Sequence, residues 1–190
     1  MNLKIITPPT VEPILLSEAL LHLRITSAVD NNLILDLITV ARETCENITN
    51  RALATQTLEL SLDEFPIGNI RLPRPPLVSV TSIYYKNNVG TDTQWLPITE
   101  YIVDTAIEPG EIVLAYGKTY PSFIPYSTNA VKIIYVTGYT TDCPLCIKQA
   151  MLLLISHFYE NREEVVTGMT MVAKLPMGVD ALLQSYRIWG

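Results

Sequence analysis

Two cysteines three residues apart, Cys143 and Cys146, form the most conspicuous chemical motif of the chain. A Cys-x-x-Cys pair at a helix N-terminus is the arrangement of thioredoxin-like redox sites, because the helix N-terminus lowers the pKa of a thiol. Such a site follows a strand of a β-α-β unit, whereas the segment before Cys143 is typical of an antiparallel strand and a turn over 138–142. We therefore expect these cysteines to be buried small apolar residues, with redox chemistry as the alternative.

Metal and acid–base chemistry would need residues that the sequence places apart. A zinc site would need two further ligands, and the candidates, Cys45, His22 and His157, fall on separate predicted helices. Neither histidine has a nucleophile and an orienting carboxylate close in sequence, so we expect partly buried, hydrogen-bonded histidines rather than general bases. We predict no metal and no cofactor.

A group of charged residues at 160–164 resembles a catalytic carboxylate cluster only in isolation: Glu160, Arg162, Glu163 and Glu164. The end of a helix with solvated or inter-subunit ion pairs explains them as well. The sequence contains no Gly-rich phosphate loop, no G-x-S-x-G and no H-E-x-x-H motif. We expect a protein that is not an enzyme and has no catalytic residues.

The element that must position everything else is the helix predicted over 147–163. Apolar residues recur there at steps of three and four, and flanking leucines widen the apolar surface over four turns. Further helices are predicted over 18–24, with Ser17 as its N-cap, over 31–49, ending at Asn50 in a left-handed conformation, and over the last residues from about 176.

Between the helices the pattern changes to short strands separated by turns. Alternation over 56–63 places Leu58, Leu60 and Leu62 on one face. Further strands are predicted over 70–72, 78–86, 95–98, 101–105, 111–116 and 130–137. The fold class is therefore α+β: a mainly helical bundle formed by 1–52 and 142–190, with an antiparallel β module inserted over 53–141.

Composition narrows the choice of function. The chain is 48% hydrophobic and only 17% charged, so we expect apolar surface that partners cover. The net charge of −6 comes without a basic stripe, so a grip on phosphate backbones or anionic lipid is not expected. We also find no apolar run of about eighteen residues and no secretory signal, which predicts an intracellular protein without a membrane span.

Three blocks in order resemble the head-to-tail connector (adaptor, head-completion) family of tailed bacteriophages, also found in prophages and gene transfer agents. The first block has Ile6-Thr7-Pro8-Pro9, Ser17-Glu18-Ala19 and His22-Leu23-Arg24. The second is Leu72-Pro73-Arg74-Pro75-Pro76-Leu77-Val78-Ser79-Val80. The third runs from His157 to Glu163 and is followed by Ala181-Leu182-Leu183 and Tyr186-Arg187. The resemblance spans nearly the whole chain.

The resemblance implies a ring-forming homo-oligomer of about twelve copies below the portal protein, at the head-tail junction of a virion assembled in the bacterial cytoplasm. Such a ring extends the DNA channel and docks a tail-side stopper or completion protein, and DNA passes without sequence-specific binding. No catalysis is implied. Relatives often use the C-terminal segment to grip the portal.

We expect contacts with neighbouring subunits or the portal at Tyr159, Arg162, Tyr186, Arg187 and Trp189. The proline-spaced arm at Pro8 and Pro9 would strap the next subunit. A second hypothesis comes from a different class of protein. In it, the β module binds a glycan or another ligand through exposed aromatic residues, namely Tyr84, Tyr85, Trp95, Tyr116 and Tyr120.

Overall fold

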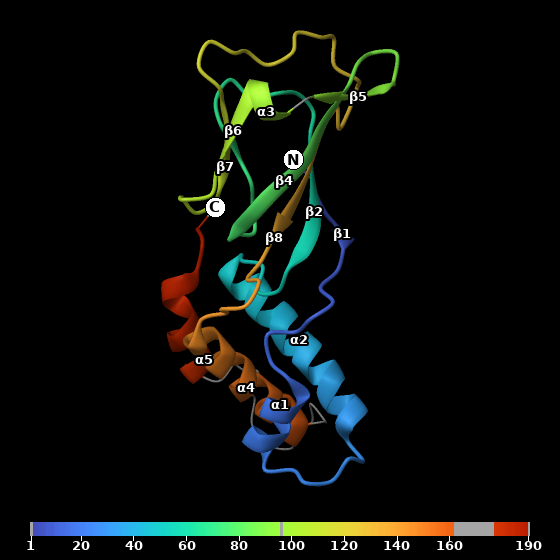
Figure 1. The fold of residues 1–190 in the computed structure, drawn as a ribbon. Coiled ribbons are helices and arrows are strands. Elements are labelled where there is room, and N and C mark those ends of the chain that lie inside the picture. The colour runs from blue at the N-terminus through green and yellow to red at the C-terminus, as the bar shows by residue number, and fades with distance from the viewer. Residues whose placement is uncertain (1, 96, 162–176, 190) are drawn as a thin grey trace, which may run out of the picture. The chain divides into compact units, whose positions relative to one another are not determined.

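The computed structural model describes residues 2–95, 97–161 and 177–189 (Figure 1). The chain divides into two compact units, each built from two stretches of sequence. The β unit combines Met1–Thr10 with Ala54–Tyr139, and the helical unit combines Val11–Leu53 with Thr140–Gly190. The first ten residues thus lie in the β unit, whereas we expected 1–52 to lie wholly with the helices.

The fold class is α+β, as predicted, but the description as a mainly helical bundle is not supported. Among the described residues, strands are almost as extensive as helices, so neither dominates. The reason lies in the first residues and in the long middle segment, where strands account for most of the ordered structure. The helix and strand contents are closer to each other than the strongly apolar helix predicted over 147–163 suggested.

Two antiparallel sheets form the β unit. The larger has the strand order β1-β2-β8-β4-β5 and the smaller β3-β7-β6. The strands of the first are β1 (Asn2–Thr7), β2 (Gln56–Leu62), β8 (Val131–Thr137), β4 (Leu77–Lys86) and β5 (Asp92–Trp95). Those of the second are β3 (Ile70–Arg71), β7 (Glu111–Leu114) and β6 (Tyr101–Asp104), the last preceded by the helical turn α3 (Pro97–Glu100).

Both sheets contribute to one apolar core. Leu58, Leu60, Ile83, Val131, Ile133 and Tyr135 enter it from the larger sheet, and Ile70, Leu72, Tyr101 and Ile112 enter it from the smaller sheet and its flanks. The proline corner at 73–76 is fixed from β8: the Tyr135 hydroxyl donates to the Pro73 carbonyl at 2.8 Å. The Thr137 hydroxyl contacts the carbonyl oxygens of Arg74 and Pro76. Proline has no backbone N–H, so the prolines of this corner cannot donate hydrogen bonds to a neighbouring strand. The side chains of Tyr135 and Thr137 hold the corner in place instead.

Two strand predictions need correction. The strand expected over 95–98 is wrong, because β5 ends at Trp95 and Pro97 begins α3, a position at which proline suits a helical first turn. Strand β1 was not predicted at all. It pairs antiparallel with β2, with Leu3 opposite Leu60 and Ile5 opposite Leu58.

The helical unit contains α1 (Leu16–Leu23), α2 (Asn31–Thr49), α4 (Leu145–Glu160), α5 (Met177–Leu183) and the short 3-10 helix η1 (Gln184–Tyr186). Helix α4 contacts α1, α2 and α5. Its stripe of Ile147, Ala150, Met151, Leu154 and Ile155 is fully buried. Within the helical unit, this helix is therefore central, as expected. The part of the predicted helix beyond residue 161 lies outside the described residues.

The ends of the first two helices show how local sequence sets them. Helix α2 has the bounds predicted for it, and Asn50 ends it with a φ of 55°, as expected. Helix α1 begins earlier than predicted, with Leu15 rather than Ser17 at the N-cap. There the Glu18 carboxylate reaches back and accepts the N–H of the N-cap residue Leu15 at 2.8 Å, and no side chain caps the first turn in the way expected of Ser17.

Candidate functional site

Hydrogen bonds fasten the C-terminal segment to the end of α2. Arg51 Nε donates to the Tyr186 carbonyl at 2.6 Å. The Asn50 side-chain amide donates to the Ile188 carbonyl at 3.0 Å, and the Ile188 N–H donates to the Thr49 carbonyl at 2.9 Å. Because the carbonyl of Thr49 lies in the last turn of α2, it has no partner within the helix and is free to accept. Residues 186–188 are therefore held in a defined path.

The side chains of this segment divide into held and exposed ones. Arg187 forms an ion pair with Asp180 on α5, with 3.0 Å between Nη2 and Oδ1. Burial raises the pKa of the Tyr186 hydroxyl, and the neighbouring Cys146 raises it further. Trp189, by contrast, is 81% exposed. The segment thus presents one large apolar side chain at the end of a fixed backbone, an arrangement typical of an interface anchor.

The other predicted interface residues are dispersed. Tyr159 is half-buried and its hydroxyl donates to Asp30 Oδ2 at 2.5 Å, so it links α4 to the start of α2 within the chain. Pro8 is exposed and Pro9 half-buried, directly after β1. Arg162 lies outside the described residues. The structure therefore groups Tyr186, Arg187 and Trp189, and does not bring Tyr159 or the two prolines into that group.

The residues that fasten the segment, Thr49, Asn50 and Arg51, were missed as site residues. Asn50 was recognised only as the end of α2. The partners are more than 130 residues apart in sequence, and no local pattern links them. The burial of Arg51, which demands a partner for its charge, is visible only in the structure and gave no signal in the sequence.

The cysteines are only partly as predicted. Cys45 is buried, Cys143 is half-buried and Cys146 is exposed. Burial raises the pKa of Cys45 to about 12 and that of Cys143 to about 11. Both thiols are therefore protonated at neutral pH, which is the opposite of an activated redox cysteine. The prediction of burial is wrong for Cys146, which lies in the first turn of α4.

The histidines and acidic residues give no metal cluster within 2–95, 97–161 and 177–189. His22 lies on α1, and His157 lies on α4 beside Asn161, whose amide nitrogen is 3.3 Å from the His157 Nδ1. Over the same residues, no helix combines the length and the apolar character needed to span a membrane.

The aromatic residues proposed for ligand binding are mostly engaged inside the β unit. Tyr85 and Tyr120 join Phe65 and Phe123 in a cluster, in which the rings of Phe65 and Tyr120 stack at 4.7 Å. Tyr84 is half-buried, Tyr116 is fully exposed, and nothing is described of the Trp95 side chain. Among the described residues, these aromatic side chains therefore do not form one exposed aromatic face.

Comparison with known proteins identifies the fold. No protein-family model and no curated protein matches the sequence. Among solved structures, a chain in the neck of an empty gene transfer agent (GTA) particle, computed with C6 symmetry, superposes with a TM-score of 0.78 at 24% identity. The match covers 100% of this chain and 97% of the other. The chain has the fold of a GTA neck chain.

Two further solved structures contain a chain with the same fold. One is the virion of a native gene transfer agent particle, with a TM-score of 0.79 and 23% identity. The other is the neck of a native GTA particle computed with C12 symmetry, with a TM-score of 0.74 and 25% identity. Each match covers 100% of this chain and 97% of the other chain. The resemblance to head-to-tail connectors that the sequence suggested is confirmed at the level of the fold.

Proposed function

We propose that this protein is a structural head-to-tail connector of a tailed phage, prophage or gene-transfer-agent-like particle. It forms a ring below the portal, extends the DNA channel and provides the docking surface for tail-side proteins. The likeness to neck chains over 100% of this chain carries the proposal, because both units and their connections belong to the matched fold. The protein acts at the head-tail junction and catalyses no reaction.

Symmetry supports the ring. The necks that contain the matching chains were computed with C6 and C12 symmetry, and a cyclic arrangement needs a surface on each copy that fits a different surface on the next. Exposed apolar side chains on the helical unit are suited to such contacts, namely Val11, Leu15, Leu21, Val29 and Leu145. The net charge of −6 suits a conduit through which DNA slides without being held.

The C-terminal segment is the proposed attachment to the portal. The contacts of Tyr186 and Arg187 hold the backbone of the segment in position, and Trp189 inserts into a pocket of the portal. Tyr159, Arg162 and the Pro8–Pro9 arm remain proposed subunit contacts. The glycan-binding alternative is not pursued, since Tyr85 and Tyr120 pack into the aromatic cluster of the β unit.

Replacement of the exposed tryptophan tests this attachment. We expect Trp189→Ala to weaken binding to the cognate portal by about 30-fold, the loss typical of an interface hot spot of about 2 kcal/mol. The melting temperature should not change, because Trp189 is 81% exposed and its loss opens no cavity. Binding is measured by titrating immobilised portal with the purified variant.

Tyr116→Ala is the control, since Tyr116 is also an exposed aromatic residue and has no part in the proposed ring or portal contacts. It should bind the portal as the wild type does. Equal portal affinity of the Trp189→Ala variant and the wild type would show that the C-terminal segment is not the anchor, while leaving ring formation to be judged by mass.

A further inference from the structure

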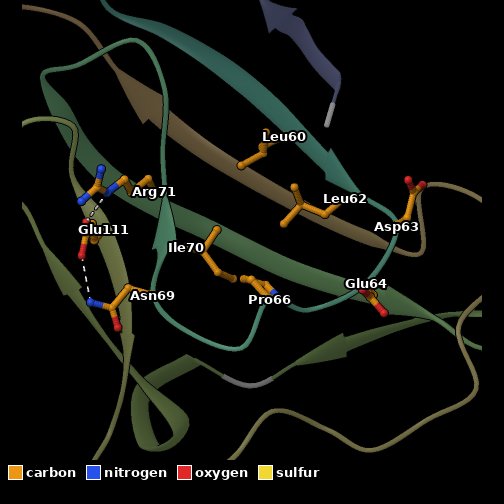
Figure 2. A pocket seen from close by; sticks show the side chains of 9 residues that line it. All are labelled: Leu60, Leu62, Asp63, Glu64, Pro66, Asn69, Ile70, Arg71 and Glu111. Atoms are coloured by element: carbon orange, nitrogen blue, oxygen red, sulfur yellow. Dashed lines mark hydrogen bonds and ion pairs between the residues drawn. The ribbon is translucent and has the colours of Figure 1, made fainter. Parts of the chain in front are cut away.

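A pocket of about 710 Å³ lies in the β unit beside the loop between β2 and β3. Its floor is apolar, formed by Leu60, Leu62, Pro66 and Ile70. Its rim is polar and mostly acidic, formed by Asp63, Glu64, Asn69, Arg71 and Glu111. Figure 2 shows the apolar side chains between Arg71 and Glu111 at one end and Asp63 and Glu64 at the other. A volume of this size is typical of a binding pocket.

The charges of the rim do not cancel. The single cation, Arg71, forms an ion pair with Glu111, with 2.8 Å between Nε and Oε1. The Asn69 amide donates to the other Glu111 oxygen at 2.9 Å. The amide hydrogen bond and the guanidinium lower the pKa of Glu111, which keeps that carboxylate ionised. Asp63 and Glu64, both exposed, therefore give the opposite end of the pocket an uncompensated negative charge.

The loop that forms one wall is fixed, although it has no regular secondary structure. Asp63 accepts the Asn129 N–H at 2.8 Å, and the Tyr120 hydroxyl donates to the Gly68 carbonyl at 2.7 Å. The ring of Phe65 stacks on Tyr120 at 4.7 Å. These contacts pin both ends of the loop, so the pocket is formed before any partner arrives and little entropy is lost on binding.

We propose that this pocket binds an extended segment of a partner protein in which an apolar side chain is flanked by lysine or arginine. The apolar side chain lies on Leu62, Pro66 and Ile70, and the flanking cation faces Asp63 and Glu64. The charge of Asp63 and Glu64 favours a segment that carries lysine or arginine, because opposite charges attract across an interface. The site is additional to the C-terminal segment and does not depend on its role.

A peptide probe tests the proposal on the isolated chain. Fluorescein-labelled Lys-Leu-Lys-Leu-Lys is titrated with the protein and followed by anisotropy, with Glu-Leu-Glu-Leu-Glu and Lys-Ser-Lys-Ser-Lys as comparison peptides. We expect only the first peptide to bind. The double variant Asp63→Asn, Glu64→Gln should weaken that binding at least about tenfold, since it removes both uncompensated charges while asparagine still accepts the Asn129 N–H.

The matched control is Asp36→Asn, Glu43→Gln, which removes two exposed carboxylates from α2 and changes the net charge equally. It should leave peptide binding unchanged.

Backbone amide shifts in the nuclear magnetic resonance spectrum locate the bound peptide independently of any variant. The amide signals of residues 62–71 and 111 should shift. Equal binding of the serine peptide, equal loss in both double variants, or shifts elsewhere would overturn the proposal. So would self-association that depends on Asp63 and Glu64, because it would make a second copy the occupant. The peptide-binding results do not bear on ring formation.

Discussion

Replacement of Arg42 by alanine should lower the free energy of unfolding of the helical unit by about 3 kcal/mol or more. The Arg42 side chain is 6% exposed and pairs with Glu12 at 2.8 Å and with Glu46 at 2.9 Å. Glu46 also accepts the Leu53 N–H at 2.8 Å. Alanine would remove the Arg42 charge from both carboxylates, one of them almost fully buried, which is far more costly than losing a surface ion pair.

The measurement is urea unfolding followed by the helical circular dichroism signal. Glu43→Ala is the control on the same helix, because Glu43 is 62% exposed and lies 3.6 Å from the same guanidinium. We expect it to change the free energy of unfolding by less than about 0.5 kcal/mol. If Arg42→Ala were as stable as Glu43→Ala, the buried network would not be what fastens the segment at Glu12 and the turn at Leu53 to α2.

Gly138→Ala should be at least as damaging, and its effect should fall on the β unit. Gly138 has a φ of +108°, and a Cβ there would lie 2.1 Å from the carbonyl oxygen of Ala54. The neighbouring contact is backbone, so no side chain can turn away to make room. The strand end at Gly138 and the segment before β2 would have to separate, and we expect a loss of more than about 3 kcal/mol in the free energy of unfolding.

Gly117→Ala separates the clash from the backbone conformation. Gly117 also has a positive φ, +73°, but a Cβ there meets nothing within 4 Å. Alanine should therefore cost only about 1 kcal/mol, the price of the left-handed conformation. Thermal unfolding of the two variants side by side gives the comparison. Similar melting temperatures for both would mean that the close approach of Ala54 does not constrain the fold.

Local sequence patterns predicted the helices and strands that are determined by residues close together in the chain. Helix α2 was predicted with its observed bounds, because Ile34, Ile38, Ala41 and Cys45 form one buried stripe and Asn50 ends it. Strand β1 was missed, because its partner β2 lies about fifty residues away and only their pairing makes the strand stable. The prediction of a strand over 95–98 was wrong because it followed the apolar residues there and overlooked Pro97, which begins α3.

The sequence indicated which residue types belong to the candidate site, but not how those residues are held in space. Trp189 was chosen as a large apolar residue, and its exposure agrees with a role in binding without testing it. The bonds from Asn50 and Arg51 that fix the segment are tertiary and leave no trace in local sequence. Tyr159 looks the same in sequence as an unbonded interface tyrosine, yet its hydroxyl donates to Asp30, the residue directly before α2.

The mass of the native protein tests the connector role most directly. Light scattering across a concentration series, on the chain alone and then with its portal protein, measures the number of copies in the particle. We predict a ring of about a dozen copies, formed either by the chain alone or on the portal. A monomer or small dimer whose mass does not change when portal is added would contradict the proposed function.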